Sequence, residues 1–148
     1  MVCLITKILI VEDEYDIANL ISGHLTDHEN KCDIASSFEK AETFINNEYD
    51  VLIVDVLLKD EVETGIDFAI KYKELHHNVF IIAISGNESI KIDHTIVDYF
   101  MRKPLSLEKI SNIINVNKRM SMIELVNKLD TTNELLVDIK NLLSKKND

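Results

Sequence analysis

The sequence predicts an α/β fold in which a five-stranded parallel sheet carries helices on both faces. Five short runs rich in β-branched residues alternate with stretches of helical periodicity, which is the pattern of a repeated strand-helix unit. The clearest run, from Tyr49 to Asp55, is largely apolar and ends abruptly in a carboxylate. Such a run is typical of a strand buried on both faces of a parallel sheet.

Composition narrows the class of protein. A chain of 148 residues suits one domain with an appendage. The formal net charge of −10, with scattered basic residues, argues against binding to nucleic acid. No run is long enough to cross a membrane, and Lys7 followed by acids makes the start unlike a signal peptide. We therefore expect a soluble, cytoplasmic protein without a membrane partner.

Two strand-helix units precede the run that ends at Asp55. The apolar run from Lys7 to Val11 predicts the first strand, and apolar residues at helical spacing predict a helix from about Glu14 to Asp27. Residues 31–35 form a short second strand. The sequence Ser36-Ser37-Phe38-Glu39 then resembles a capping box and starts a second helix.

Three further units follow Asp55. Gly65 is expected to turn the chain from a loop into a third helix. Residues 78–84 form the fourth strand, and the weakly patterned segment 88–98 is expected to hold a brief, irregular fourth helix. Residues 99–101 form the fifth strand, after which Ser106 can cap a fifth helix.

Polar side chains lie where four of the predicted strands end: Glu12 and Asp13, Asp55, Ser85 and Lys103. The carboxyl ends of parallel strands share one edge, where open α/β sheets bind ligands. In a flavodoxin-like, doubly wound sheet of order 2-1-3-4-5, the first and third strands are neighbours and three carboxylates converge. Their repulsion requires a cation or raised pKa values, and Mg²⁺ suits such oxygen ligands.

These groups have complementary chemistry for phosphoryl transfer. Asp55 can act as a nucleophile toward phosphorus. Lys103 can neutralise charge on the transferred group, and the Ser85 hydroxyl can donate a hydrogen bond to one of its oxygens.

The chain resembles the receiver domain of two-component response regulators, of the kind found in chemotaxis regulators. The resemblance is carried, in family order, by Ile8–Glu14, Asp50–Asp55, Ile84–Gly86 and Lys103-Pro104, across about the first 118 residues. It implies that Asp55 accepts a phosphoryl group from a histidine kinase or a phosphotransfer protein in a phosphorelay.

The resemblance also implies roles for the surrounding residues. Mg²⁺ would be bound by Asp13, Asp55 and the backbone carbonyl of Leu57, with Glu12 acting largely through water. Ser85 and Phe100 would form the switch that responds to phosphorylation. In this family the bond between the lysine and the following proline, here Lys103-Pro104, is usually cis.

Two departures from the family pattern concern the loops at this edge. Lys59 stands where a proline is common, and the first glycine after Asp55 is Gly65, which implies a lengthened loop. Between Ser85 and Lys103 the chain is shorter than usual, so the fourth helix must be reduced or reshaped. This departure alters the face made by the fourth helix, fifth strand and fifth helix, through which the family signals and forms its standard dimer.

A receiver domain at residues 1–118 leaves a helical tail at residues 119–148. The tail carries an a/d heptad that favours a short coiled coil and a homodimer: Met122, Leu125, Leu129, Thr132, Leu136, Ile139 and Leu143. Asp130–Asn133 are poor helix formers, so a helical hairpin packed on the receiver and a frayed tail remain open. Nothing in the tail resembles a DNA-binding or catalytic domain.

Three functions fit these features. The first is a stand-alone response regulator that signals through protein contacts and slowly hydrolyses its own acyl phosphate, without being an enzyme in the ordinary sense. The slow rate is expected because Leu57 offers no group to position a water. The second is a receiver-fold adaptor that acts mainly through its tail. The third, a dehalogenase-type phosphatase, is disfavoured because Leu57 replaces the second aspartate of its Asp-x-Asp motif.

Overall fold

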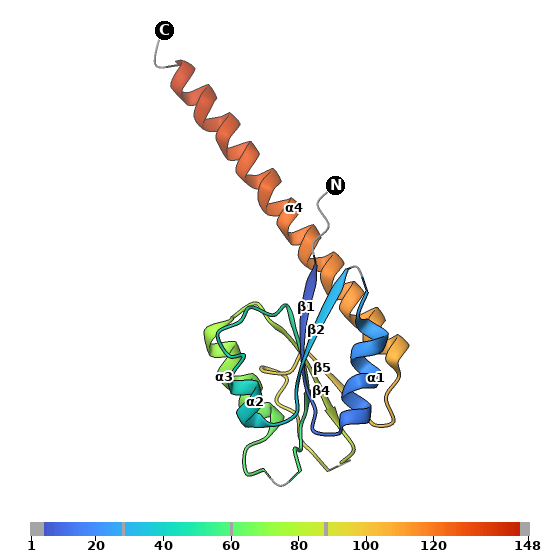
Figure 1. Ribbon diagram of the computed structural model, residues 1–148. Helices are drawn as coiled ribbons and strands as arrows, with labels where there is room; N and C mark the ends of the chain where they lie inside the picture. Colours follow the sequence, from blue (N-terminus) through green and yellow to red (C-terminus); the bar gives the residue numbers. More distant parts are fainter. Residues whose placement is uncertain (1–4, 28, 60, 88, 146–148) are drawn as a thin grey trace. The chain divides into compact units, whose positions relative to one another are not determined.

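The computed structural model describes residues 5–27, 29–59, 61–87 and 89–145. Five parallel strands form one sheet in the order β2-β1-β3-β4-β5, with helices on both faces (Figure 1). This confirms the predicted flavodoxin-like fold and its helical extension. The elements are β1 (Thr6–Val11), α1 (Tyr15–Leu25), β2 (Asn30–Ala35), α2 (Phe38–Glu42), β3 (Val51–Asp55), α3 (Gly65–Leu75), β4 (Phe80–Ser85), β5 (Tyr99–Arg102) and α4 (Leu107–Lys145).

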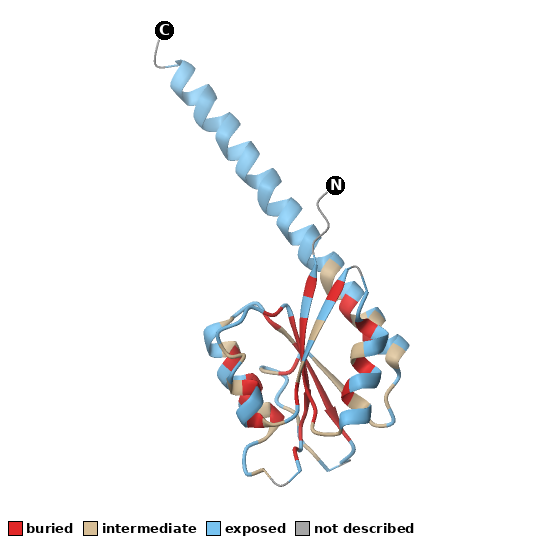
Figure 2. Ribbon diagram, viewed as in Figure 1, coloured by how far each residue is buried: buried red, intermediate tan, exposed pale blue. Residues whose placement is uncertain are grey.

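The sheet is built around β1, β3 and β4, whose side chains are almost all buried (Figure 2). Continuous apolar runs suit these central positions because helices cover both faces. On one face lie α1 and the first turn of α4, and on the other lie α2 and α3 (Figure 1). Pairing of Val11 with Val54 and of Asp55 with Ile84 aligns the carboxyl ends of the three strands.

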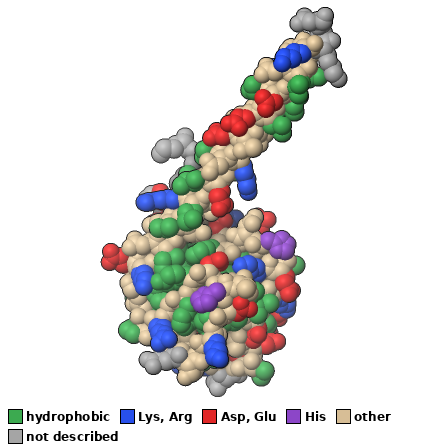
Figure 3. Space-filling view, turned by 180° about the vertical axis from the view of Figure 1, so that it is seen from behind, with side chains coloured by type: hydrophobic (Ala, Val, Ile, Leu, Met, Phe, Trp, Pro, Cys, Tyr) green, Lys and Arg blue, Asp and Glu red, His purple; other side chains and the backbone are tan. Residues whose placement is uncertain are grey.

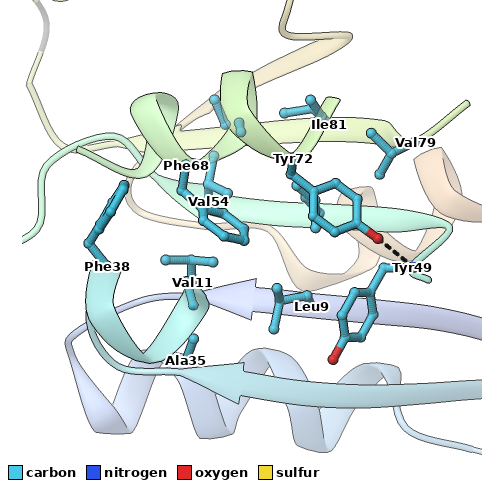
Figure 4. Packing of buried hydrophobic residues seen from close by; sticks show 14 of the residues in the cluster. Leu9, Val11, Ala35, Phe38, Tyr49, Val54, Phe68, Tyr72, Val79 and Ile81 are labelled. Carbon is cyan, nitrogen blue, oxygen red and sulfur yellow. Dashed lines mark hydrogen bonds between the residues drawn. The ribbon is translucent and has the colours of Figure 1, made fainter. Parts of the chain in front are cut away.

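Aromatic rings fill the core beneath α2 and α3 (Figure 4). Phe38 meets Phe68 edge to face, with ring centroids 6.2 Å apart. The Tyr72 ring is fully buried, and its hydroxyl accepts a hydrogen bond from the Tyr49 backbone N–H at 2.7 Å. The same hydroxyl donates to the Asn47 carbonyl at 2.7 Å. A tyrosine can be buried here because both hydrogen-bonding capacities of its hydroxyl are used.

The segment between β4 and β5 differs from the sequence prediction. The expected fourth helix at residues 88–98 is absent from the described part of this segment, residues 89–98; residue 88 lies outside it. Two side chains instead form hydrogen bonds with nearby backbone N–H groups. Asp93 Oδ1 accepts from the Thr95 N–H at 2.9 Å, and Asn87 Oδ1 accepts from the Ser89 N–H at 2.9 Å. Such local bonds compete with helix formation.

Apolar residues of the same segment compensate for the missing helix. Val97 is buried in the core. Three partly buried residues of the segment pack against this core: Ile90, Ile92 and Ile96. An irregular chain therefore covers the part of the sheet that a helix was expected to cover.

Gly65 begins α3, but not for the reason that the sequence suggests. None of the three glycines has a positive φ. The backbone of Gly65 instead passes so close to Asp55 that a β-carbon would overlap the Asp55 carbonyl oxygen. The absent side chain thus lets α3 begin directly against the end of β3. A capping box formed by Thr64 and Asp67 fixes this start.

The α4 helix runs without interruption from Leu107 to Lys145. Asp130–Asn133 are helical, which differs from the hairpin that these residues could have started. The chain divides into one compact unit that ends at Ser111 and a second that begins at Asn112. Within the described residues, no helix combines the length and the apolar character that a membrane span requires.

The first prediction concerns the buried hydroxyl of Tyr72. Replacing Tyr72 with Phe leaves the buried Tyr49 N–H without its acceptor, so unfolding should cost about 1–3 kcal/mol less. Urea unfolding measures this loss. Tyr15→Phe is the matched control, because the Tyr15 side chain is 78% exposed and should contribute almost nothing. Equal effects of the two substitutions would contradict the assigned hydrogen bonds.

The second prediction concerns Gly65. Gly65→Ala must displace backbone rather than a flexible side chain, and we expect a loss of stability of about 1–3 kcal/mol. Gly23→Ala is the control, because Gly23 lies within α1 and a β-carbon there has open space. That change should stabilise the protein by up to about 1 kcal/mol. Thermal unfolding of both variants tests the contrast, and a harmless Gly65→Ala would refute the close approach.

Candidate functional site

Five side chains predicted from strand ends lie along one edge of the sheet. Glu12 and Asp13 follow β1, Asp55 ends β3, Ser85 ends β4, and Lys103 follows β5. The register places Asp55 beside Ile84 and Ser85 beside Arg102. The Lys103-Pro104 peptide bond at this edge is cis.

Three carboxylates form the centre of the site. Oxygen atoms of Glu12, Asp13 and Asp55 all lie within 4.8 Å of one another. Glu12 is only 2% exposed and Asp55 only 5%, so water screens their charges poorly. Like charges at this spacing repel strongly, and the arrangement requires positive charge or bound protons.

Lys103 supplies positive charge to the site from the position directly after β5. Its Nζ atom lies 2.8 Å from Asp55 Oδ2, 3.2 Å from Glu12 Oε2 and 3.4 Å from Glu14 Oε1. Burial by itself lowers the pKa of Lys103, but the ion pairs with Asp55 and Glu12 outweigh burial and raise it. Lys103 is therefore charged, although one cation faces several carboxylates.

Glu12 shows that the neutralisation is incomplete. Its buried Oε2 has no hydrogen-bond partner among the described residues, although Lys103 is close enough to form an ion pair with it. Burial is the main cause that raises the pKa of Glu12 to about 7, and the nearby Asp55 adds to the shift. A buried carboxylate oxygen that accepts no hydrogen bond from the described residues, beside Asp13 and Asp55, fits a hard divalent cation, which prefers carboxylate and water oxygens.

The loop after Asp55 is attached to the acidic site at two points. The Leu57 N–H donates to Asp55 Oδ1 at 3.1 Å, and the Lys59 N–H donates to Asp13 Oδ2 at 2.8 Å. Proline at the Lys59 position could not make the second bond because it has no N–H. The departure from the family pattern therefore adds a direct contact between the loop and the cluster.

The same loop also caps α2. The Glu61 carboxylate accepts hydrogen bonds from the Phe38 N–H, at 2.9 Å to Oε2 and 3.2 Å to Oε1. A carboxylate at a helix amino terminus satisfies an orphan donor and complements the helix dipole. Sequence reasoning missed this contact because the two residues are far apart in the chain and neither shows a local capping pattern toward the other.

The two residues predicted to form the switch, Ser85 and Phe100, contact neighbouring residues of the receiver in this structure. Ser85 is fully buried, and its hydroxyl oxygen accepts a hydrogen bond from the Asn87 N–H at 3.0 Å. Phe100 is half-buried and packs against the aromatic core. Glu14, which sequence reasoning placed only at the start of a helix, joins the site through Lys103. Its position in the acidic run Glu12-Asp13-Glu14 was the available signal.

Known proteins resemble this chain in sequence and in fold. The response regulator receiver domain family matches residues 8–115. The sensory transduction protein LytR of Staphylococcus saprophyticus is 29% identical over 115 residues, or 74% of this chain and 44% of that protein. The chain thus spans less than half the length of this relative.

Several solved structures have the same fold as this chain. NtrX of Brucella abortus has a TM-score of 0.71 at 22% identity, and the match covers 82% of this chain and 28% of NtrX. A receiver domain protein from Clostridium thermocellum has a TM-score of 0.68 at 24% identity, with 80% of this chain and 99% of that chain covered. With a family match over most of its length, this chain belongs to the response regulator receiver domain family of two-component systems.

Proposed function

We propose that the protein is a response regulator that accepts a phosphoryl group on Asp55 from a histidine kinase or a phosphotransfer protein. The observation that carries the proposal is the ion pair of 2.8 Å between Lys103 Nζ and Asp55 Oδ2, beside Glu12 and Asp13. A buried carboxylate at a ligand-binding edge, with a lysine and a cation-binding cluster around it, is suited to attack phosphorus.

Each residue has a defined task in this proposal. A carboxylate oxygen of Asp55 forms a bond to phosphorus while the bond from phosphorus to the donor's histidine nitrogen breaks. Lys103 neutralises charge on the phosphoryl oxygens, and the Ser85 hydroxyl turns from Asn87 to donate to one of them. Asp13, Asp55 and the Leu57 carbonyl would hold Mg²⁺, with Glu12 acting through water, and the ion would supply further neutralisation.

The response would pass from Ser85 to Phe100. Ser85 lies at the end of β4, and Phe100 lies in the neighbouring strand β5, where it pairs with Ala83. Movement of the hydroxyl toward the phosphoryl group would free space that the half-buried ring of Phe100 can enter. Because the segment that precedes β5 is irregular rather than helical, this surface differs from a receiver with a regular fourth helix.

We also propose that the acyl phosphate is long-lived. Leu57, two residues after Asp55, is 49% exposed and has no polar side chain that could orient a hydrolytic water. Autodephosphorylation should therefore be slow, and the protein would hold its signal until a partner reads or removes it.

The output is proposed to be a change in protein contacts. The described residues form the receiver domain and the long helix α4, whose exposed residues offer surfaces for such contacts. Downstream recognition would then use the receiver surface in the cytoplasm, and α4 would pair two copies of the chain. The alternative is a receiver-fold adaptor that acts through α4, for which phosphorylation would be incidental.

The third prediction tests phosphorylation directly. Incubation with acetyl phosphate and Mg²⁺ should add one phosphoryl group to the wild-type chain, as seen by intact mass spectrometry. Asp55→Asn should add none. Lys103→Ala should slow the reaction by about 10²-fold or more, because it removes the cation that faces the transferred group.

Asp50→Asn is the matched control for charge and strand. Asp50 lies just before β3 at the opposite end from Asp55, and its carboxylate accepts only from the Lys7 N–H among the bonds described. This variant should react like wild type. Phosphorylation of Asp55→Asn at the wild-type rate would contradict the proposed acceptor, and a chain that is never phosphorylated would favour the adaptor.

A further inference from the structure

The carboxyl-terminal part of α4 exposes an apolar stripe. Every described residue from Arg119 to Lys145 is exposed, including many large aliphatic side chains. Figure 3 shows hydrophobic side chains along this segment, with acidic ones among them. A single helix cannot bury its own side chains, and an apolar surface of this extent marks an interaction site.

The middle of this helix is poorly suited to stand alone. Asp130, Thr131, Thr132 and Asn133 have low helix propensity. Two of their side chains bond back to the preceding turn: Thr131 Oγ1 donates to Asn127 O at 3.0 Å, and Thr132 Oγ1 donates to Lys128 O at 2.8 Å. Most helical stability in proteins comes from packing of an apolar face, so a continuous helix through these residues indicates a packing partner.

The spacing of the stripe defines the partner's geometry. Seven residues alternate at intervals of three and four and form the a/d seam: Met122, Leu125, Leu129, Thr132, Leu136, Ile139 and Leu143. A strict seven-residue repeat is matched by a second helix with the same repeat, wound into a left-handed supercoil. Thr132 can lie within this seam because its hydroxyl is already bonded inside its own helix.

The charges beside the seam permit a second copy of the same helix. The acidic residues Glu124, Asp130, Glu134 and Asp138 occupy outer positions b, c and f. The flanking e and g positions hold only two charged residues, Lys128 and Lys140. In a parallel pair, a g position faces the e position of the partner's next heptad, so Lys128 would face Asn133 and Lys140 would face Leu135. No two like charges would meet.

We propose that the a/d seam of α4 is a homodimer interface whose occupant is the same seam of a second copy of this chain. The pairing belongs to the proposed function, but it does not depend on phosphorylation. Two copies bury two identical stripes at once, whereas any other partner must supply an apolar stripe of equal length and period.

The fourth prediction separates the seam from its apolar neighbours. Leu136 at an a position is 59% exposed, and the adjacent Val137 at a b position is 56% exposed. Light scattering on the full chain at about 50 µM, without Mg²⁺ or phosphate donor, should give the mass of two chains for wild type. Leu136→Lys should halve this mass, and Val137→Lys should leave it unchanged.

Folding and phosphorylation are measured on the same samples. Both side chains are exposed, so both variants should keep the wild-type thermal transition of the receiver and should still be phosphorylated at Asp55. A wild-type chain that is monomeric at this concentration would overturn the proposal. Equal masses for the two variants would also overturn it, because the seam and the outer position would then be equivalent. Neither result would bear on phosphorylation, which the mass spectra report separately.

Discussion

Glu12, Asp13 and Asp55 repel one another, and the surrounding edge of the sheet holds the three carboxylates together. Two of the three carboxylates are almost fully buried, and their oxygens lie within 4.8 Å of one another. The sheet order forces this proximity, because β1 and β3 are neighbours, two acids directly follow β1 and an acid ends β3. Removing such charges from water is costly unless they are compensated. Lys103 compensates in part, and Glu12 Oε2, which accepts no hydrogen bond among the described residues, is the atom that a cation or a proton would satisfy.

The surrounding chain holds these charges in place. Gly65 allows α3 to start against the Asp55 backbone, and the Lys59 N–H fixes one oxygen of Asp13. Glu61 extends the same loop to the amino terminus of α2 through Phe38. The described residues of this loop are thus hydrogen-bonded both to the acidic cluster and to the first residue of α2.

Much of the fold and the site could be predicted from sequence because its signals are local. The runs that end at Val11 and Asp55 are long and apolar, and the carboxyl ends of parallel strands lie at one edge of a sheet. The sequence alone therefore predicts that Glu12, Asp13 and Asp55 lie close together. Other features depend on contacts between distant residues. The Glu61 cap on Phe38 and the hydroxyl of Tyr72 between Asn47 and Tyr49 leave no local pattern. The expected helix before β5 failed because the Asp93 and Asn87 side chains compete for backbone bonds, which periodicity does not register.

We propose that the acidic cluster is strained when no divalent cation is bound and is stabilised by one. Thermal unfolding of wild type and Asp13→Asn can be compared with and without Mg²⁺. Without Mg²⁺ the variant should unfold at the higher temperature, since it loses one repelling charge and keeps an acceptor for Lys59. Saturating Mg²⁺ should reverse the order, because the wild type keeps the Asp13 ligand and the variant does not. A ligand at about 100 times its Kd adds about 2.7 kcal/mol to the free energy of unfolding of the protein that binds it. Asp16→Asn, an exposed acid in α1, should follow wild type in both conditions. Equal stabilisation of all three proteins by Mg²⁺, or none, would rule out a cation site at Asp13.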